Sequence, residues 1–152
     1  MPFASDIEAG LGRAVVNALP EEQINEYLGH RFEALCAEWL VEQAKKGKLP
    51  IAATAVSSWW GTNPDKREQD DIDVLAADRI EKRLIIGECK YRESFYETAE
   101  IDDLESKRSL VKGYVATNFM LFTKREVSVA TRAKLANRGD WRLVTLEDMY
   151  AE

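Results

Sequence analysis

Three strand-like segments follow one another between residues 51 and 91 with no helix between them, and this run restricts the fold more than any other part of the sequence. Their lengths, apolar runs and alternation are typical of strands. The connections between them are short, which favours an antiparallel meander. We therefore expect three sequential antiparallel strands, over residues 51–60, 70–77 and 83–91.

Helical segments lie on both sides of this meander in the sequence. Pro20-Glu21-Glu22 has the acidic first turn of a helix, and Gly47 lies near the expected end of that helix. After residue 91, helices and strands alternate, and a strand–helix–strand unit favours parallel pairing. The predicted elements are a helix over 97–112, a strand over 114–123, a helix over 128–137 and a strand over 141–146. The order predicts an α/β (α+β) fold in which helices flank a mixed central sheet.

The length and composition fit one domain in a reducing compartment. The 152 residues suffice for a sizeable core, and no apolar run approaches the roughly 20 residues of a membrane helix. The N-terminus lacks the basic and apolar regions of a signal peptide, and two cysteines do not suggest a disulfide framework. We expect an N-terminal lead-in over residues 1–20, one domain over 21–152, a cytoplasmic location and no membrane contact.

Missing residue types and motifs restrict the chemistry. His30 is the only histidine, which together with only two cysteines argues against a four-ligand zinc site. Neither the G-x-x-x-x-G-K-[ST] phosphate loop nor the G-x-S-x-G nucleophile motif occurs. Any catalysis must therefore use carboxylates, lysines and a hard metal ion.

The stretch GECK, residues 87–90, puts two charged side chains at the end of an apolar strand. Glu88 and Lys90 are two residues apart, so their side chains point to the same face of the sheet. If the hairpin turn lies at residues 79–82, Asp73 falls opposite Glu88, with Cβ atoms about 4.5–5.5 Å apart. We therefore expect Asp73, Glu88 and Lys90 together at one end of the sheet.

The expected neighbours Asp73 and Glu88 are both acids, and two carboxylates this close repel each other unless a cation lies between them. A hard divalent ion such as Mg²⁺ or Mn²⁺ would relieve that repulsion, and the nearby Lys90 would stabilise negative charge on a phosphate. This set suits metal-assisted attack on a phosphodiester. A surface ladder of ion pairs without a catalytic role is the alternative.

Four segments carry a resemblance to a known family. They are LGHRFE, WWGT, DIDVLA and GECKY, which begin at residues 28, 59, 71 and 87. Asp73 followed by Glu88-Cys89-Lys90 resembles the signature of the PD-(D/E)XK nuclease superfamily, whose restriction-endonuclease-like core has the order αβββαβ. Together the four segments resemble one group more closely, the nuclease-like domain of unknown function at the C-terminus of archaeal and bacterial AAA-type ATPases.

The resemblance implies a specific site. It implies Asp73 and Glu88 as ligands of Mg²⁺ or Mn²⁺ and Lys90 as the lysine of the active site. Glu33, on the first helix, would be the additional acid that many members use there; a solvated helix glutamate is the alternative. The family's Glu-Ile-Asp begins with Asp71 in this chain, which keeps a carboxylate at that position.

A basic segment, residues 124–142, is the predicted nucleic-acid contact. It holds six lysines and arginines against two acids in a chain of net charge −6, and such cations would follow a phosphate backbone. The segment lacks the glycine and the aromatic residue that the family has near its start, although Lys124 matches. A solvated helix face is the alternative. The residues assigned to DNA contact are Lys124, Arg125, Arg132 and Arg138.

Two functions follow from these observations. The first is a metal-dependent nuclease that cuts DNA, with RNA as the second choice, and that works with an AAA-type ATPase in cis or in trans; a homodimer stays open. The second is a catalytically silent nuclease-like module that binds DNA or a protein for an ATPase, which the acidic net charge favours. Of Trp59 and Trp60, we expect one in the core, while the other is open to packing, to base stacking or to a partner surface.

Overall fold

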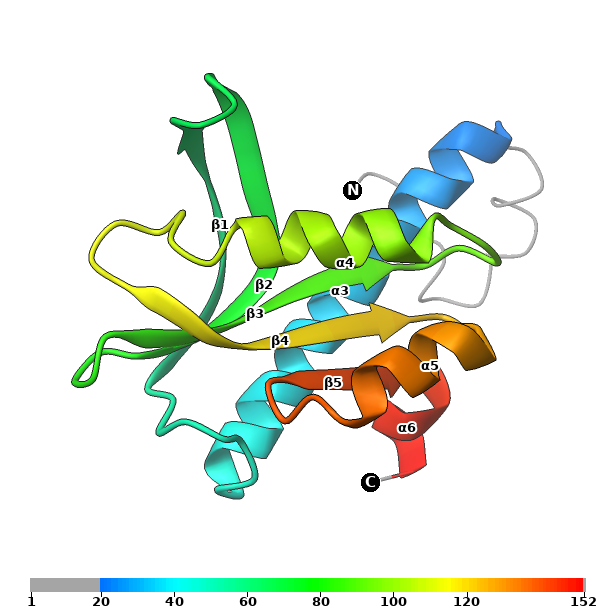
Figure 1. The fold of residues 1–152 in the computed structure, drawn as a ribbon. Coiled ribbons are helices and arrows are strands. Elements are labelled where there is room, and N and C mark those ends of the chain that lie inside the picture. The colour runs from blue at the N-terminus through cyan, green and yellow to red at the C-terminus, as the bar shows by residue number, and fades with distance from the viewer. Residues whose placement is uncertain (1–19, 152) are drawn as a thin grey trace, which may run out of the picture.

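The computed structural model describes residues 20–151 (Figure 1). Five strands form one sheet in the order β1-β2-β3-β4-β5. The elements are α3 (Glu21–Lys45), β1 (Ala55–Asn63), β2 (Glu68–Asp78), β3 (Arg83–Lys90), α4 (Glu97–Ser106), β4 (Val115–Thr123), α5 (Val129–Ala136), β5 (Trp141–Thr145) and α6 (Leu146–Ala151). The mixed α/β architecture and the predicted order of helices and strands are confirmed.

The sheet combines the two pairing modes that the sequence predicts. β1, β2 and β3 are antiparallel neighbours, whereas β3, β4 and β5 are parallel. Each parallel connection carries a helix, α4 between β3 and β4 and α5 between β4 and β5. The carboxyl ends of these three strands therefore lie at one edge of the sheet.

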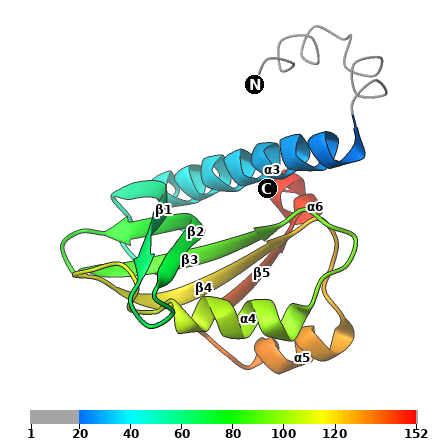
Figure 2. The ribbon, with the colours of Figure 1, turned by 90° about the horizontal axis from the view of Figure 1, so that it is seen from above.

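Helices cover both faces of the sheet. Figure 2 shows α3 and α6 on one face and α4 and α5 on the other. The strand β3 supplies both layers, because its side chains alternate. Leu84 and Ile86 pack with Ile101 and Leu104 of α4, while Ile85 packs in the layer that α3 covers. The residues that α3 contributes to its layer include Phe32, Cys36, Trp39 and Leu40.

The turn between β2 and β3 has the predicted register. Asp78 pairs with Arg83, and the ladder continues to Val74 opposite Gly87. Gly87 is required at this position, since a Cβ there would lie 2.9 Å from both the Phe122 ring and the Val74 side chain. The next residue of β3 after this tightly packed glycine is Glu88.

Two predicted boundaries differ from the structure by more than the others do. The first strand begins at Ala55 rather than directly after Pro50, because residues 51–54 make a local turn before Thr54 bonds the carbonyl oxygen of Ala77. The helix predicted over 97–112 ends at Ser106, where three-residue turns replace helical hydrogen bonds.

Two further expectations concern the N-terminal segment and the membrane. Apart from Pro20, the N-terminal lead-in predicted for residues 1–20 lies outside them. Among residues 20–151, no helix is both long and apolar enough to cross a membrane. The cytoplasmic location stays a prediction.

Candidate functional site

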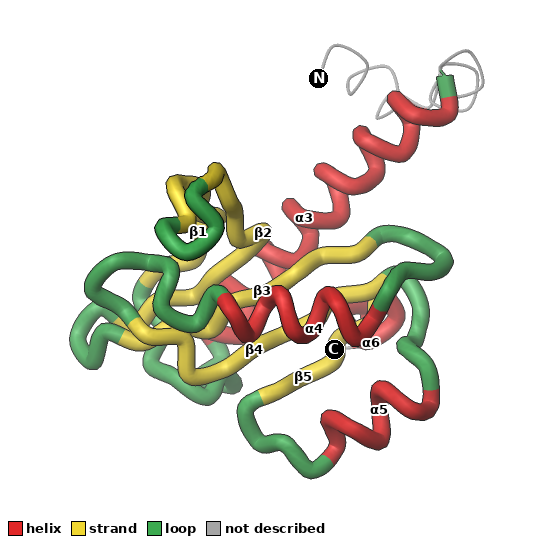
Figure 3. Tube along the Cα trace, turned by 45° about the horizontal axis from the view of Figure 1, so that its top comes forward, coloured by secondary structure: helices red, strands yellow, loops and turns green. Residues whose placement is uncertain are grey.

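A cleft of about 700 Å³ opens where the carboxyl end of β3 meets the N-terminal half of α3. Figure 3 shows this half of α3 extending beyond the edge of the sheet. Among the described residues that line the cleft, six are acidic and three are lysines or arginines. The acids are Glu26, Glu33, Asp71, Asp73, Glu88 and Glu93, and the bases are Lys90, Arg92 and Lys124. The cleft is therefore a region of negative charge that suits a cation.

A bulge in β2 positions Asp73 at this cleft. One residue of β1 faces both Asp73 and Val74, so the register shifts by one at this point. The flanking pairs are Ser57 with Leu75 and Trp59 with Ile72. Bulges of this kind re-aim a side chain at the rim of a sheet. Asp73 Oδ2 accepts a 2.9 Å hydrogen bond from the backbone N–H of Cys89, which holds its carboxylate against the end of β3.

Glu88 and Lys90 lie on the same face of β3, as their spacing predicts. Lys90 Nζ lies 3.4 Å from Glu88 Oε1 and 3.2 Å from Glu100 Oε1 of α4. The Lys90 side chain is 17% exposed and that of Glu88 is 12% exposed. Lys90 is therefore a largely buried cation between two acids. Burial alone would lower the pKa of Lys90, but Glu88 and Glu100 raise it above its usual value.

The two carboxyl groups of Asp73 and Glu88 are close enough to share a proton. Burial, then the charge of Asp73, raises the pKa of Glu88 to about 8. Burial also raises the pKa of Asp73, against hydrogen bonds from Cys89 and Glu88 that lower it. The two acids therefore disfavour each other's charged form, and a cation beside them would relieve this repulsion.

Glu33 joins these two acids from α3. It lines the cleft, and burial, followed by the charge of Asp73, raises its pKa, whereas His30 lowers it. His30 Nδ1 lies 3.7 Å from Glu33 Oε2. We call Glu33, Asp73 and Glu88 the cleft acids. The four residues predicted for the catalytic site, these acids and Lys90, thus converge on one cleft.

The cleft acids fit Mg²⁺ or Mn²⁺ better than an ion that requires a complete protein cage. No group of three or more Asp, Glu, His or Cys side chains among residues 20–151 is already arranged to hold a metal ion. Mg²⁺ commonly binds through one or two carboxylates, with waters and substrate phosphates as the remaining ligands. The adjacent carboxyls of Asp73 and Glu88 meet that requirement, and burial, followed by repulsion from the neighbouring acid, raises the pKa of each group.

The four residues assigned to DNA contact do not form one surface. Lys124 lines the cleft, where it lies 2.9 Å from Glu93 and 4.9 Å from the centroid of the Tyr91 ring. Arg125 also pairs with Glu93. Arg132, on α5, lies 3.6 Å from Glu126.

Arg138 is separated from the cleft by the length of the sheet. It precedes β5, so it lies at the edge opposite the carboxyl ends of the parallel strands. There it pairs with Glu105 at 3.0 Å and with Asp140 at 3.1 Å. All four predicted contacts therefore have acidic partners, and their role in binding DNA stays a prediction.

A second charged cluster beside the cleft was missed by the sequence analysis. Lys107 is 4% exposed, and its Nζ donates to the Asp71 carbonyl oxygen at 2.7 Å. It also lies 3.2 Å from both Asp70 and Asp103, and Lys66 lies 2.8 Å from Asp103. We call Asp70, Asp103, Lys66 and Lys107 the hairpin cluster, because it fastens the β1–β2 hairpin to α4. The sequence predicts a helix through Lys107, over residues 97–112, whereas the helix ends at Ser106 and Lys107 is buried just after it.

The fold and the site together define a mixed α/β domain with acidic side chains and a lysine gathered at the carboxyl end of a central strand. The chain belongs to the DUF234 family, described as "Archaea bacterial proteins of unknown function", whose profile matches residues 1–104. The match includes the three cleft acids and Lys90 and ends within α4.

Two individual proteins resemble the chain. It is 26% identical over 124 residues to the uncharacterized protein MJECL04 of Methanocaldococcus jannaschii, a match that covers 82% of this chain and 26% of that protein. The crystal structure of protein VC1899 from Vibrio cholerae matches with a TM-score of 0.60 and 20% identity over 88% of this chain and 34% of that chain. At this identity the likeness concerns the fold. The chain spans about a quarter of the length of the curated relative it matches.

Proposed function

We propose that this chain is a divalent-metal-dependent nuclease domain that hydrolyses phosphodiester bonds in DNA and uses Mg²⁺ or Mn²⁺. The observation that carries the proposal is the convergence of Asp73, Glu88 and Lys90 in one acidic cleft. The resemblance of these residues to the PD-(D/E)XK signature supports the same reading. So does the αβββαβ order of the elements around them.

Each residue has a role in this proposal. Asp73 and Glu88 would hold the metal ion, which when bound polarises a phosphate oxygen and lowers the pKa of a water. Lys90 carries its charge 3.4 Å from Glu88, where it stabilises negative charge on a phosphate that enters the cleft. Glu33 accepts a hydrogen bond from a water on the α3 side and so orients it.

The proposed partners are DNA and an AAA-type ATPase, in cis or in trans; a second copy of this chain is a further candidate. The curated relative has roughly three quarters of its length outside the matched region, which leaves room for another domain in that protein. Such an arrangement would let an ATPase move or open the nucleic acid that the cleft receives.

A catalytically silent module of the same fold is the second candidate. The ion pairs of Lys124, Arg125, Arg132 and Arg138 favour it, because paired cations contribute less to phosphate binding. In that case the chain would bind DNA or a protein for the ATPase and would neither bind a divalent ion nor cut DNA.

The test is cleavage of plasmid and single-stranded DNA with Mg²⁺ or Mn²⁺, beside the variants Asp73→Ala and Lys90→Ala. We expect the wild type to cleave and each variant to lose about 100-fold or more in rate, the usual cost of removing one group that stabilises developing charge. The matched controls are Asp102→Ala and Lys112→Ala, which change exposed residues outside the cleft and should leave the rate unchanged.

Thermal unfolding with each ion separates the two candidates. An ion that binds the folded state at 100 times its Kd stabilises it by about 2.7 kcal/mol, and Asp73→Ala should abolish that gain. If the wild type neither cleaves DNA nor is stabilised by either ion, the nuclease proposal is wrong and the silent module is favoured.

A further inference from the structure

The two indoles of Trp59-Trp60-Gly61 lie on opposite faces of β1, which is an edge strand of the sheet. Trp59 packs against the core layer that α4 covers, and its ring lies over Gly61, where a Cβ would come within 2.8 Å of it. Trp60 points to the other face and is 75% exposed. The glycine makes room for the buried indole, whereas nothing in the core accounts for the exposed one.

Trp60 is the strand partner of a residue that lines the cleft. In the sheet it is paired with Asp71, and residues paired across two strands present their side chains to the same face, with Cβ atoms about 4.5–5.5 Å apart. Asp71 lines the cleft together with Asp73 and Glu88. The indole is therefore presented beside the carboxylates to which the proposed function assigns the metal ion.

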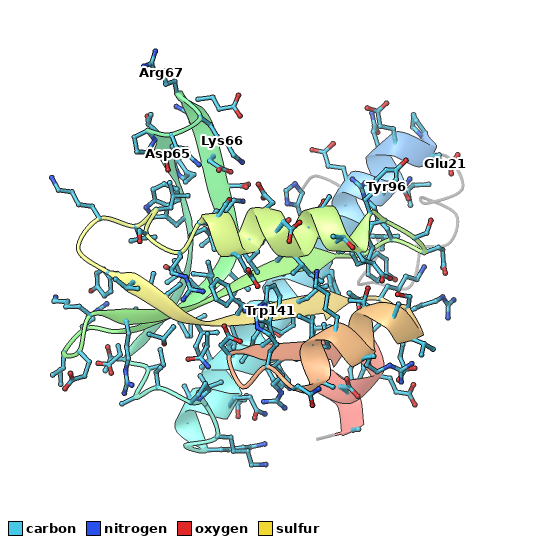
Figure 4. The ribbon with its side chains drawn as sticks, viewed as in Figure 1. Glu21, Asp65, Lys66, Arg67, Tyr96 and Trp141 are labelled. Atoms are coloured by element: carbon cyan, nitrogen blue, oxygen red, sulfur yellow. The ribbon has the colours of Figure 1, made fainter. Side chains whose placement is uncertain are left out.

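The strand that carries Trp60 is held in place although it forms the edge of the sheet. The β1–β2 hairpin stands away from the body, with Asp65, Lys66 and Arg67 at its tip (Figure 4). Lys66 bonds Asp103 of α4 at 2.8 Å, and Lys107 bonds the carbonyl oxygen of Asp71 at 2.7 Å. These contacts fix the position of the indole relative to the cleft.

The surroundings of Trp60 suit a flat ring better than a protein surface. Its neighbours on the same face are polar: Ser58 and Thr62 along β1, and Gln69 and Asp71 across on β2. Hot spots of protein interfaces are surrounded by residues that exclude water from an apolar centre, and no other exposed large hydrophobic residue lies on the described part of this hairpin. An aromatic side chain among hydrogen-bonding groups is the usual platform for an unpaired base.

The charges in the cleft agree with a base on one side and phosphates on the other. A base is uncharged, so the nearby carboxylate of Asp71 does not repel it. Lys90, at the end of β3, and Lys124, directly after β4, line the cleft on the side of β2 that faces away from β1, where they can receive the backbone. A strand that crosses the cleft in this way has at least one base out of its stack.

We infer that Trp60 is a base-stacking residue that selects single-stranded or unpaired nucleic acid, holding one base beside the phosphate to be cut. This inference rests on the proposed nuclease function for its place in catalysis. Base–aromatic stacking tolerates any sequence because every base has a π-face. Selection is therefore by strandedness rather than by sequence.

The test measures binding without cleavage. The affinity of a labelled oligothymidylate is followed by fluorescence anisotropy with Ca²⁺ in place of Mg²⁺, and again in EDTA, for the wild type, Trp60→Ala and Trp60→Phe. An abasic oligonucleotide and a duplex are the comparison probes. Tyr150→Ala is the matched control, because Tyr150 is a similarly exposed aromatic residue, 74% exposed, on α6. Thermal unfolding checks that each variant is folded.

We expect Trp60→Ala to weaken binding of oligothymidylate by about 5- to 100-fold, the range that stacking of one base supplies. Trp60→Phe should recover most of the affinity, and Tyr150→Ala should leave it unchanged. The abasic probe should bind wild type and Trp60→Ala equally, and the wild type should prefer the single strand to the duplex.

Other results would overturn the inference in distinguishable ways. If Trp60→Ala binds oligothymidylate as the wild type does, or if the duplex binds as tightly, Trp60 is not the selecting residue, yet the metal-dependent cleavage test stands on its own. If no nucleic acid binds and the wild type self-associates through Trp60 in sedimentation, the indole belongs to a protein interface. Trp60-dependent binding without any cleavage would retain the stacking residue and exclude the nuclease.

Discussion

The cleft acids with Lys90 and the hairpin cluster both lie next to the β1–β2 hairpin. They differ in whether there are as many lysines as acids. In the hairpin cluster two lysines face two aspartates, with N–O distances of 2.8–3.6 Å. Burial alone would raise the pKa of Asp70, but bonds from Asn63, the backbone of Asp71 and Lys107 lower it to about 2. Among the cleft acids the shifts are upward, because burial and mutual repulsion exceed what Lys90 offsets.

The difference separates a structural cluster from a candidate site. Buried charges that only support a fold are expected to be paired and hydrogen-bonded, and the hairpin cluster meets that condition. The cleft acids meet it only in part: Glu88 has Lys90 at 3.4 Å and Asp73 accepts from Cys89, but burial and mutual repulsion still raise the pKa of both acids. Perturbed carboxyl groups in a cleft are a recognised feature of functional sites, and the unmatched charge here is of the sign that a metal ion neutralises.

The largest effect on stability should come from breaking the matched cluster. Lys107→Met keeps the apolar stem and removes the charge, which leaves Asp70, Asp103 and the Asp71 carbonyl without their buried donor. We expect a loss of about 2–4 kcal/mol in the free energy of unfolding, measured by urea denaturation. Glu88→Gln removes repulsion instead and should change that free energy by less than about 1 kcal/mol. Equal losses in the two variants would mean that Glu88 is as structural as Lys107.

The acid dependence of stability gives a smaller and more specific contrast. Because the pKa of Asp70 is about 2 in the folded protein and 3.8 ordinarily, its stabilising contribution is present above pH 3.8. It is lost as pH falls toward 2. We expect wild type to exceed Asp70→Asn by about 1–2 kcal/mol at pH 5, after allowance for solvent screening, and the two to converge near pH 2.

Asp71→Asn is the control for that series. Asp71 is the neighbouring residue, but its side chain makes none of the bonds that Asn63 and Lys107 make to Asp70. Its substitution should keep the loss of stability that the wild type shows between pH 3.8 and pH 2, as followed by urea denaturation. If the free energy of unfolding of Asp70→Asn stays parallel to that of the wild type over this range, the Asp70 carboxylate is not stabilised by its partners in the hairpin cluster.

The sequence was sufficient to predict most of what brings the catalytic candidates together. The short turn at residues 79–82 fixes the register of β2 and β3 as far as Val74 opposite Gly87, and the next residues along the two strands are Asp73 and Glu88. The bulge that aims Asp73 could not be predicted, because it depends on the pairing of β2 with the edge strand β1. The alternation of residues along one strand carries no information about a shift in the register of its pairing with a neighbouring strand.

Pairings between distant segments were the other limit. The basic composition of residues 124–142 predicted a phosphate-binding surface, but Glu93 and Glu105, which precede this segment, pair with Lys124, Arg125 and Arg138. Counting charges along the sequence cannot reveal such partners. Lys107 was missed for the same reason, since its acids come from β2 and α4 and the helix was predicted to continue through it.

The smallest effect we expect compares two cations of that basic segment. Lys124 lines the cleft, whereas Arg138 lies at the opposite edge of the sheet. Each phosphate contact contributes about 0.7 to the slope of log affinity against log salt for a single strand. Lys124→Ala should therefore lower the slope measured with oligothymidylate by about 0.7, and Arg138→Ala should leave it unchanged. A larger change for Arg138 would move the nucleic-acid path away from the cleft acids and toward α5, and the contrast between the two clusters would then no longer identify the site.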